Sequence, residues 1–272
     1  MRLRLKRTDK DYYGVSEYIL PVVRVAAKYD KFIQIMCEIL NTFDTFSADL
    51  VNKVKKTLEL EKYKINEDDE TVKTAYKLFA DGLADFYWHV VDTEFAKEAK
   101  KFDQDLYEKS GLRYEDYRLG RYRGLLFETL IDTLVRDRFQ GNGKQYETGC
   151  EMHINGTLIL ARYGDGNSRH KKTLDIVGWD EKMQYGEFYG CKINPNRFEN
   201  SNYRFFMEIK KALNTESGTR YILALVSADA TRNLKAQKEW LEEEDPTCHI
   251  DFDLIGREAI FDISQYAIPE IA

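Results

Sequence analysis

The segment KKTLDIVGWDEKMQYGEFYGCKINP, residues 171–195, predicts the centre of the fold. It contains two apolar runs, LDIVGW and EFYGCKI, separated by a polar turn, which is the pattern of two neighbouring β-strands. The first run carries an acidic side chain, Asp175, and the second carries a lysine, Lys192. A carboxylate and an ammonium group side by side on adjacent strands suit a metal ion and a phosphate group. Position 190, two residues before the lysine, is a glycine.

The residues around these strands predict an α/β domain over residues 119–272. An amphipathic helix at 121–139 precedes the strands and is followed by the glycines of GNG at 141–143. The dipeptide Asn155-Gly156 indicates a tight β-hairpin. Because helices and strands then alternate, we expect a mixed central sheet flanked by helices. The later segments predict a helix at 202–214, a strand at 220–229, a helix at 231–244 and strands at 249–256 and 259–264.

Residues 1–118 predict an all-helical N-terminal region. Apolar residues recur at helical spacing along most of it, and no linker rich in Gly, Pro or Ser interrupts it. Contact with DNA, a homodimer surface and docking of a partner protein are the three roles we expect for this region. The predicted helices begin at Ser16, Ser47, Thr71 and Thr93, and the last one ends at Gly111.

Composition excludes several classes of protein. Hydrophobic residues make up 43% and charged residues 32% of the 272 residues, which is typical of a globular domain with a sizeable core. No apolar run approaches the roughly 18 residues of a membrane span, and the N-terminus lacks the apolar core of a secretory signal, so we expect a cytoplasmic location and no membrane partner. The four cysteines and four histidines show no zinc-ligand spacing. A net charge of −6 indicates that any nucleic-acid contact is confined to a local basic surface.

The order of elements and the positions of these residues resemble the PD-(D/E)xK nuclease superfamily, which includes many restriction and DNA-repair endonucleases. In that family a helix ahead of the sheet often supplies a glutamate, the second core strand an aspartate and the third strand the (D/E)xK pair. The matching residues here are Glu128, Asp175 and Lys192. The resemblance spans residues 120–230 and implies a restriction-endonuclease-like core. It also implies a metal-dependent endonuclease acting on DNA, with a role in restriction or antiviral defence.

The resemblance implies a metal site as well. Asp175 and Glu128 would hold Mg²⁺ or Mn²⁺, and the backbone carbonyl of Cys191 would be a further ligand. Such ions prefer hard oxygen ligands, so two or three carboxylates suffice to bind one. Lys192 would orient the attacking water or stabilise the charge that develops on the phosphate.

Gly190 departs from the family pattern because it has no side chain to bind a metal. Strand alternation places Glu187 on the opposite face from Lys192, so Glu187 is a substitute acid only if a β-bulge shifts the strand. Glu128 is the other candidate for the second carboxylate. The remaining alternative is that Gly190 silences cleavage, which predicts a catalytically inactive module that binds nucleic acid or a partner protein.

Two basic clusters are candidate contacts for the nucleic-acid backbone. One precedes the strand of Asp175, in the segment RHKK, and the other leads into the helix of Glu128, where it is interleaved with tyrosines. The predicted contact residues are Arg169, Lys171, Lys172, Arg121 and Arg123.

Overall fold

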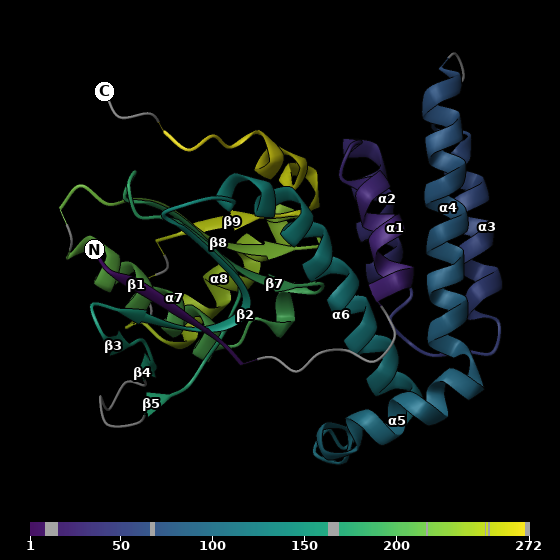
Figure 1. The fold of residues 1–272 in the computed structure, drawn as a ribbon. Coiled ribbons are helices and arrows are strands. Elements are labelled where there is room, and N and C mark those ends of the chain that lie inside the picture. Colours follow the sequence, from purple (N-terminus) through teal and green to yellow (C-terminus); the bar gives the residue numbers. More distant parts are fainter. Residues whose placement is uncertain are drawn as a thin grey trace. The chain divides into compact units, whose positions relative to one another are not determined.

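The computed structural model describes residues 1–8, 16–65, 69–162, 169–215, 217–247, 249 and 251–269. The chain forms two compact units (Figure 1), which we call the sheet unit, residues 1–10 and 131–272, and the helical unit, residues 11–130. This division differs from the predicted boundary at 118/119 for two reasons. The helix that carries Glu128 extends past the boundary between the units, and the first residues of the chain form a strand that belongs to the sheet.

The sheet is mixed, as the sequence predicts. Its strand order is β1-β2-β6-β7-β8-β9, with the short β3 paired to β2. Pairing is antiparallel from β1 to β7 and parallel from β7 to β9. A separate two-stranded ribbon pairs β4 with β5. The strands are β1 (Leu3–Arg7), β2 (Lys144–Ile154), β3 (Thr157–Leu158), β4 (Ala161–Arg162), β5 (Arg169–His170), β6 (Leu174–Asp180), β7 (Tyr185–Lys192), β8 (Arg220–Ser227) and β9 (Asp253–Ile255).

Two features of the sheet show that local sequence sets some of its elements and tertiary contacts set others. Asn155 and Gly156 both have positive φ, 49° and 83°, which is the two-residue turn that the dipeptide predicts between β2 and β3. By contrast, β1 was missed within a region predicted as helical. Its alternating pattern LRLKR buries Leu3 in the core and packs Leu5 against it.

Helices cover the face of the sheet to which Val177 and Phe188 point. The parallel pairs β7–β8 and β8–β9 require crossover connections, and α7 and α8 supply them. Aromatic side chains of α7, including Phe205 and Phe206, are part of the core cluster with Val177 and Phe188. The elements are α7 (Asn200–Asn214), α8 (Thr231–Glu244) and four short 3₁₀ segments, η1 (Arg136–Phe139), η2 (Pro195–Arg197), η3 (Arg257–Ala259) and η4 (Phe261–Gln265).

The opposite face of the sheet is packed by η1. A Cβ atom built on Gly178 would lie 2.2 Å from the ring of Phe139, so the glycine allows the ring to lie directly on the strand. The segment predicted as a last strand, residues 259–264, instead falls in η3 and η4.

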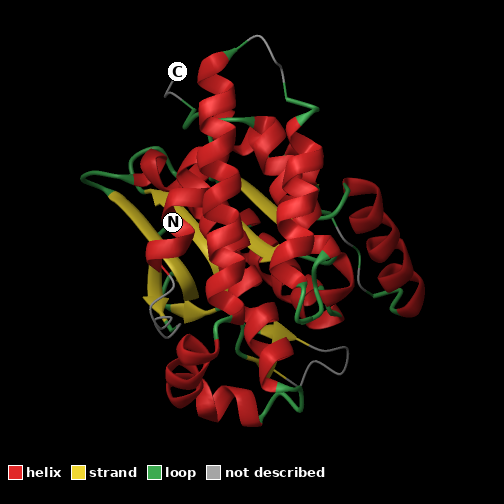
Figure 2. Cartoon of the chain, turned by 90° about the vertical axis from the view of Figure 1, so that its right-hand side faces the viewer, coloured by secondary structure: helices red, strands yellow, loops and turns green. Residues whose placement is uncertain are grey.

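The helical unit contains five complete helices among the described residues and most of a sixth (Figure 2). The first predicted helix is divided at residues 27–29 into two. Asp69 caps the fourth helix by accepting from the backbone N–H groups of Thr71 and Val72. No described helix is both long and apolar enough to cross a membrane. The helices are α1 (Ser16–Ala26), α2 (Asp30–Thr42), α3 (Leu50–Lys62), α4 (Glu70–Val91), α5 (Thr93–Glu108) and α6 (Tyr114–Val135), the last of which continues into the sheet unit.

Candidate functional site

Strand register brings Asp175 and Lys192 to one face of the sheet. The β6–β7 pairing matches Ile176 with Tyr189, so the next position along the two strands sets Asp175 opposite Gly190. Residues directly opposite each other share a face, and so do residues two apart on one strand. Asp175, Gly190 and Lys192 therefore point to the side of the sheet that α7 covers.

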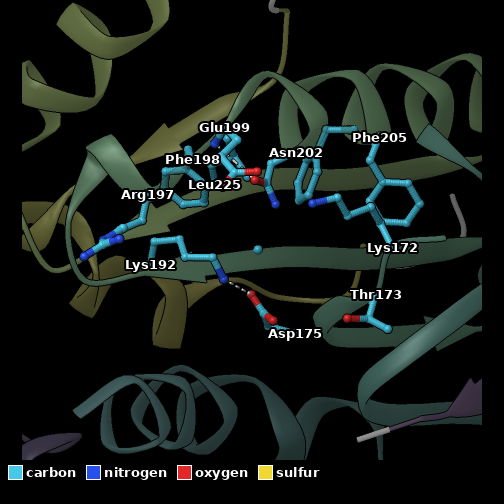
Figure 3. Close-up of a pocket in the computed structure, with 12 residues that line it drawn as sticks. Lys172, Thr173, Asp175, Lys192, Arg197, Phe198, Glu199, Asn202, Phe205 and Leu225 are labelled. Carbon is cyan, nitrogen blue, oxygen red and sulfur yellow. Dashed lines mark hydrogen bonds and ion pairs between the residues drawn. The ribbon is translucent and has the colours of Figure 1, made fainter. Parts of the chain in front are cut away.

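The two charged groups are in contact (Figure 3). Asp175 Oδ2 lies 3.8 Å from Lys192 Nζ and accepts a hydrogen bond of 2.6 Å from the backbone N–H of Cys191. The side chains are 18% and 33% exposed, so the pair is partly shielded but open to a ligand. Among the described residues no donor reaches Asp175 Oδ1.

The backbone of β7 directs one more oxygen toward this pair. The N–H and C=O of one residue in a strand point to the same neighbouring strand. Because Cys191 N–H points to β6, the carbonyl of Cys191 also faces β6, the strand of Asp175. The next residue faces the other way, since the carbonyl of Lys192 accepts from Ala228 N–H at 3.3 Å, just beyond β8.

A cavity of about 250 Å³ lies over the pair, at the start of α7. In Figure 3 Lys172 extends across it from one side, and Arg197 lies at the other end beyond Lys192. Three cationic and two acidic side chains line it, so its formal charge is positive within a chain of net charge −6. The lining residues are Lys172, Thr173, Asp175, Gly190, Lys192, Arg197, Phe198, Glu199, Asn202, Phe205, Phe206 and Leu225.

The sequence analysis did not predict several of these lining residues. Arg197, Glu199 and Asn202 follow β7 through η2, and only the crossover to α7 returns them to the strand ends. Glu199 is engaged locally, because its backbone N–H donates to Asn202 Oδ1 at 3.1 Å and its carboxylate accepts from Ser201 Oγ at 3.4 Å. Asn194 caps η2 by accepting from the backbone N–H of Asn196, and Pro195 is its first residue.

Gly190 occupies the position expected for the second acid, and the space around it is filled by neighbouring side chains. A Cβ atom at this residue would lie 2.9 Å from Phe206 Cζ and 3.0 Å from Leu225 Cδ2. Both neighbours belong to the core cluster, at 2% and 0% exposure. A glutamate at position 190 would therefore have to displace Phe206 before its carboxylate reached Asp175.

Glu187 is not a substitute acid. It is fully buried on the opposite face of β7, where its two carboxylate oxygens accept from Arg138 Nε at 3.0 Å and Nη2 at 2.7 Å. The hydroxyls of Tyr185 and Tyr189 donate to the same carboxylate. Burial, followed by the charge of Glu187, raises the pKa of Tyr189 well above its usual range. The pairing of β7 with β8 is unbroken from Tyr185 to Lys192, so no bulge brings Glu187 to the face of Lys192.

The predicted contacts on α6 belong to the helical unit. Glu128 is half-buried in that unit. Arg121 is half-buried and donates to the hydroxyl of Tyr117 at 3.0 Å. Arg123 is 5% exposed and donates to the carbonyl of Leu40, and burial lowers its pKa. The prediction that Arg123 contacts nucleic acid is therefore wrong, because its guanidinium group is inside the helical core.

The two lysines of the RHKK segment lie in different surroundings. Lys172 is half-buried and lines the cavity. Lys171 is 67% exposed and lies 3.3 Å from the Glu151 carboxylate. Arg169 is in β5, and its side chain is outside the described ones.

In the sheet unit, Asp175 and Glu199 are the acidic side chains that line the cavity and could face a Mg²⁺ or Mn²⁺ ion. No group of three or more His, Cys, Asp or Glu side chains that could hold a metal occurs among the residues that the structure describes. Asp175 is already bound by an ammonium group and a backbone amide, and Glu187 is committed to Arg138. Carboxylate-rich oxygen sites are what these ions prefer, so the cavity suits an anion better than a divalent cation.

Comparison with known proteins identifies no family. No protein-family model matches the chain, and no curated protein matches it in sequence. Protein VC1899 from Vibrio cholerae is similar in structure, with a TM-score of 0.42 and 11% sequence identity. The similarity covers 97% of this chain and 57% of that protein, so this chain spans little more than half of its length. At this level the likeness carries no argument about fold or function.

Proposed function

We propose that the sheet unit is a PD-(D/E)xK-like module that binds the phosphodiester backbone of DNA without cleaving it. The observation that carries the proposal is the packing of Phe206 against Gly190 beside the Asp175–Lys192 pair. The lysine and aspartate of the family pattern are retained in contact, while the space for the second acid is taken by an aromatic ring. This combination favours binding of a phosphate over metal-dependent hydrolysis.

The chemistry of the cavity supports an anionic ligand. The Lys172, Lys192 and Arg197 side chains are donors that match phosphate oxygens, and an enclosed surface strengthens their attraction to a negative charge. Asp175 holds the ammonium group of Lys192 near the strand ends, and Cys191 N–H fixes the carboxylate in turn. We infer that Asp175 orients Lys192 toward the phosphate, as a positioning residue.

Metal-dependent hydrolysis of DNA is the second candidate function. It is favoured by Asp175 Oδ1, which has no partner among the described residues, and by the carbonyl of Cys191 that faces the same strand. A second carboxylate from outside the cavity, for which Glu128 is the predicted source, would have to complete the site. A role in restriction or antiviral defence belongs to this second candidate and rests on the resemblance alone.

The experiment that tests the proposal measures DNA binding and DNA cleavage by the full chain. Binding of a short fluorescent DNA duplex is followed by anisotropy at low salt, and cleavage of supercoiled DNA is followed with Mg²⁺ and with Mn²⁺. The variants are Lys192→Gln, Asp175→Asn and, as a matched control, Lys211→Gln, an exposed lysine of α7 away from the cavity. We expect Lys192→Gln to weaken binding by about three- to tenfold, the size of one phosphate contact, and Lys211→Gln to change it little.

The outcomes separate the two candidates. Binding that depends on Lys192, with no cleavage in either metal, supports the proposal. Cleavage by the unaltered chain that is lost in both Lys192→Gln and Asp175→Asn overturns it in favour of the hydrolase. Equal binding by Lys192→Gln and Lys211→Gln also overturns it, because the cavity would then make no contact with DNA.

A further inference from the structure

The edge strand β1 presents a row of basic side chains that the cavity does not use. We call Arg2, Arg4 and Lys6 the β1 stripe. Successive side chains of a strand point to opposite faces, and Leu3 and Leu5 are directed to the core. The β1 stripe therefore points to the other face, and all three of its residues are exposed.

The backbone beneath the β1 stripe is held in place. β1 pairs with β2 from Leu3↔Ile154 to Arg7↔Cys150. Arg2 extends the pairing, because its N–H donates to Asn155 Oδ1 at 2.9 Å and its carbonyl accepts from Asn155 N–H at 2.8 Å. Alternate residues of an extended strand are about 6.7 Å apart, a spacing comparable to that of consecutive phosphates on a nucleic-acid strand.

The charges around the β1 stripe leave it available to an anion. None of its three side chains forms an ion pair within the described part of the chain. On β2, Arg4 faces His153 and Lys6 faces Glu151. Glu151 is buried, and its carboxylate is engaged by Lys171, which brings a fourth basic group to the same surface.

The surface also lacks the apolar anchor of a protein interface. The exposed large hydrophobic side chains among the described residues lie in the helical unit, apart from Trp240 on α8. Protein interfaces depend on buried aromatic and aliphatic anchors, whereas contact with a nucleic-acid backbone depends on Lys and Arg.

We propose that the β1 stripe and Lys171 form a DNA-backbone contact separate from the cavity. The choice of DNA as the partner rests on the function proposed above, but the residues are different. Each stripe residue would neutralise a phosphate, so its removal reduces the salt dependence of binding as well as the affinity.

The test compares two double variants that lose the same charge. Arg4→Gln/Lys6→Gln removes two members of the β1 stripe, and Arg232→Gln/Lys235→Gln removes an exposed arginine and lysine of α8. Binding of the full chain to a short DNA duplex is measured between about 50 and 200 mM salt. We expect the stripe variant to reduce the slope of log K against log salt by about 2, and to reduce affinity about tenfold or more at the lowest salt. The α8 variant should change the slope by less than about half a unit. Circular dichroism and thermal melting establish that both variants fold.

Lys192→Gln, measured alongside, distinguishes failure of this proposal from failure of the proposed function. Equal slopes for the two double variants overturn the β1 contact. Binding by Lys192→Gln then tests the DNA contact of the cavity alone. Loss of binding in the stripe variant with no effect of Lys192→Gln supports the β1 contact and removes the cavity from DNA binding. Polyglutamate that competes with the duplex at matched charge would overturn the assignment of this surface to DNA.

Discussion

At the scale of single residues, the structure predicts that Gly190 cannot be enlarged without loss of stability. Alanine at this position puts a Cβ atom 2.9 Å from Phe206 and 3.0 Å from Leu225, both in the core. Overpacking of this kind costs about 1–3 kcal/mol, and the larger glutamate should cost more. We expect Gly190→Ala to lower the free energy of unfolding by that amount, measured by equilibrium denaturation.

Gly120→Ala is the matched control for this prediction. Gly120 lies within α6 and has nothing within 4 Å of an added Cβ atom, so alanine should be neutral or stabilise by about 0.5–1 kcal/mol. Phe206→Leu combined with Gly190→Ala should recover part of the loss, because the shorter side chain frees the space. Equal effects of the two glycine substitutions would show that Phe206 does not fill the position of the missing acid.

At the scale of elements, α7 and α8 are joined by a polar contact that responds to pH. The carboxylate of Asp245, which follows α8, accepts from Asn200 Nδ2 at 3.0 Å and Thr247 Oγ1 at 2.6 Å and pairs with Arg204. These bonds lower the pKa of Asp245 below its usual range. A carboxyl group with a depressed pKa contributes stability above its unfolded pKa of about 3.9 and loses it as the pH falls further. We therefore expect the free energy of unfolding to decrease below about pH 4, by about 1 kcal/mol from this partly exposed group.

The Asp245→Asn variant tests which group is responsible. It should be less stable than the unaltered chain at pH 7, and its stability should change less on acidification, as followed by urea denaturation at a series of pH values. Glu239→Gln on the exposed side of α8 removes the same charge and should leave the acid dependence unchanged. An identical acid response in Asp245→Asn and the unaltered chain would assign the effect to another carboxylate.

At the scale of the whole molecule, the first residues of the chain form β1, the strand at one edge of the sheet. Leu3 on β1 is 3% exposed in a core otherwise built from residues after 149. We expect Leu3→Ala to cost about 2–5 kcal/mol of unfolding free energy, as is typical of a large-to-small change in a core. Fluorescence of Trp179, which is fully buried in the sheet unit, reports on the transition.

Leu78→Ala provides the comparison, because Leu78 on α4 is 62% exposed and its truncation should change stability by less than about 0.5 kcal/mol. If Leu3→Ala were equally silent, β1 would not be an integral strand of the sheet. The β1 stripe would then lack the fixed backbone on which the DNA contact depends.

The sequence by itself determined the features that depend on neighbouring residues. Hydrophobic periodicity places β6, β7, α7 and α8, and Asn155-Gly156 places the β2–β3 turn. Strand alternation correctly set Glu187 on the face away from Lys192, and the two apolar runs brought Asp175 and Lys192 onto adjacent strands. These are consequences of backbone geometry over a few residues, so they can be inferred without the rest of the chain.

Only the tertiary structure decided the features that join distant parts of the chain. The pairing of β1 with β2 spans more than 140 residues, and the Arg138–Glu187 pair joins η1 to β7. The burial of Arg123 and the contact of Phe206 with Gly190 likewise depend on which helix packs on which surface. Side-chain packing and burial are set by contacts between elements, and this is why Arg123 lies in the helical core and the position of the expected acid is a packed glycine.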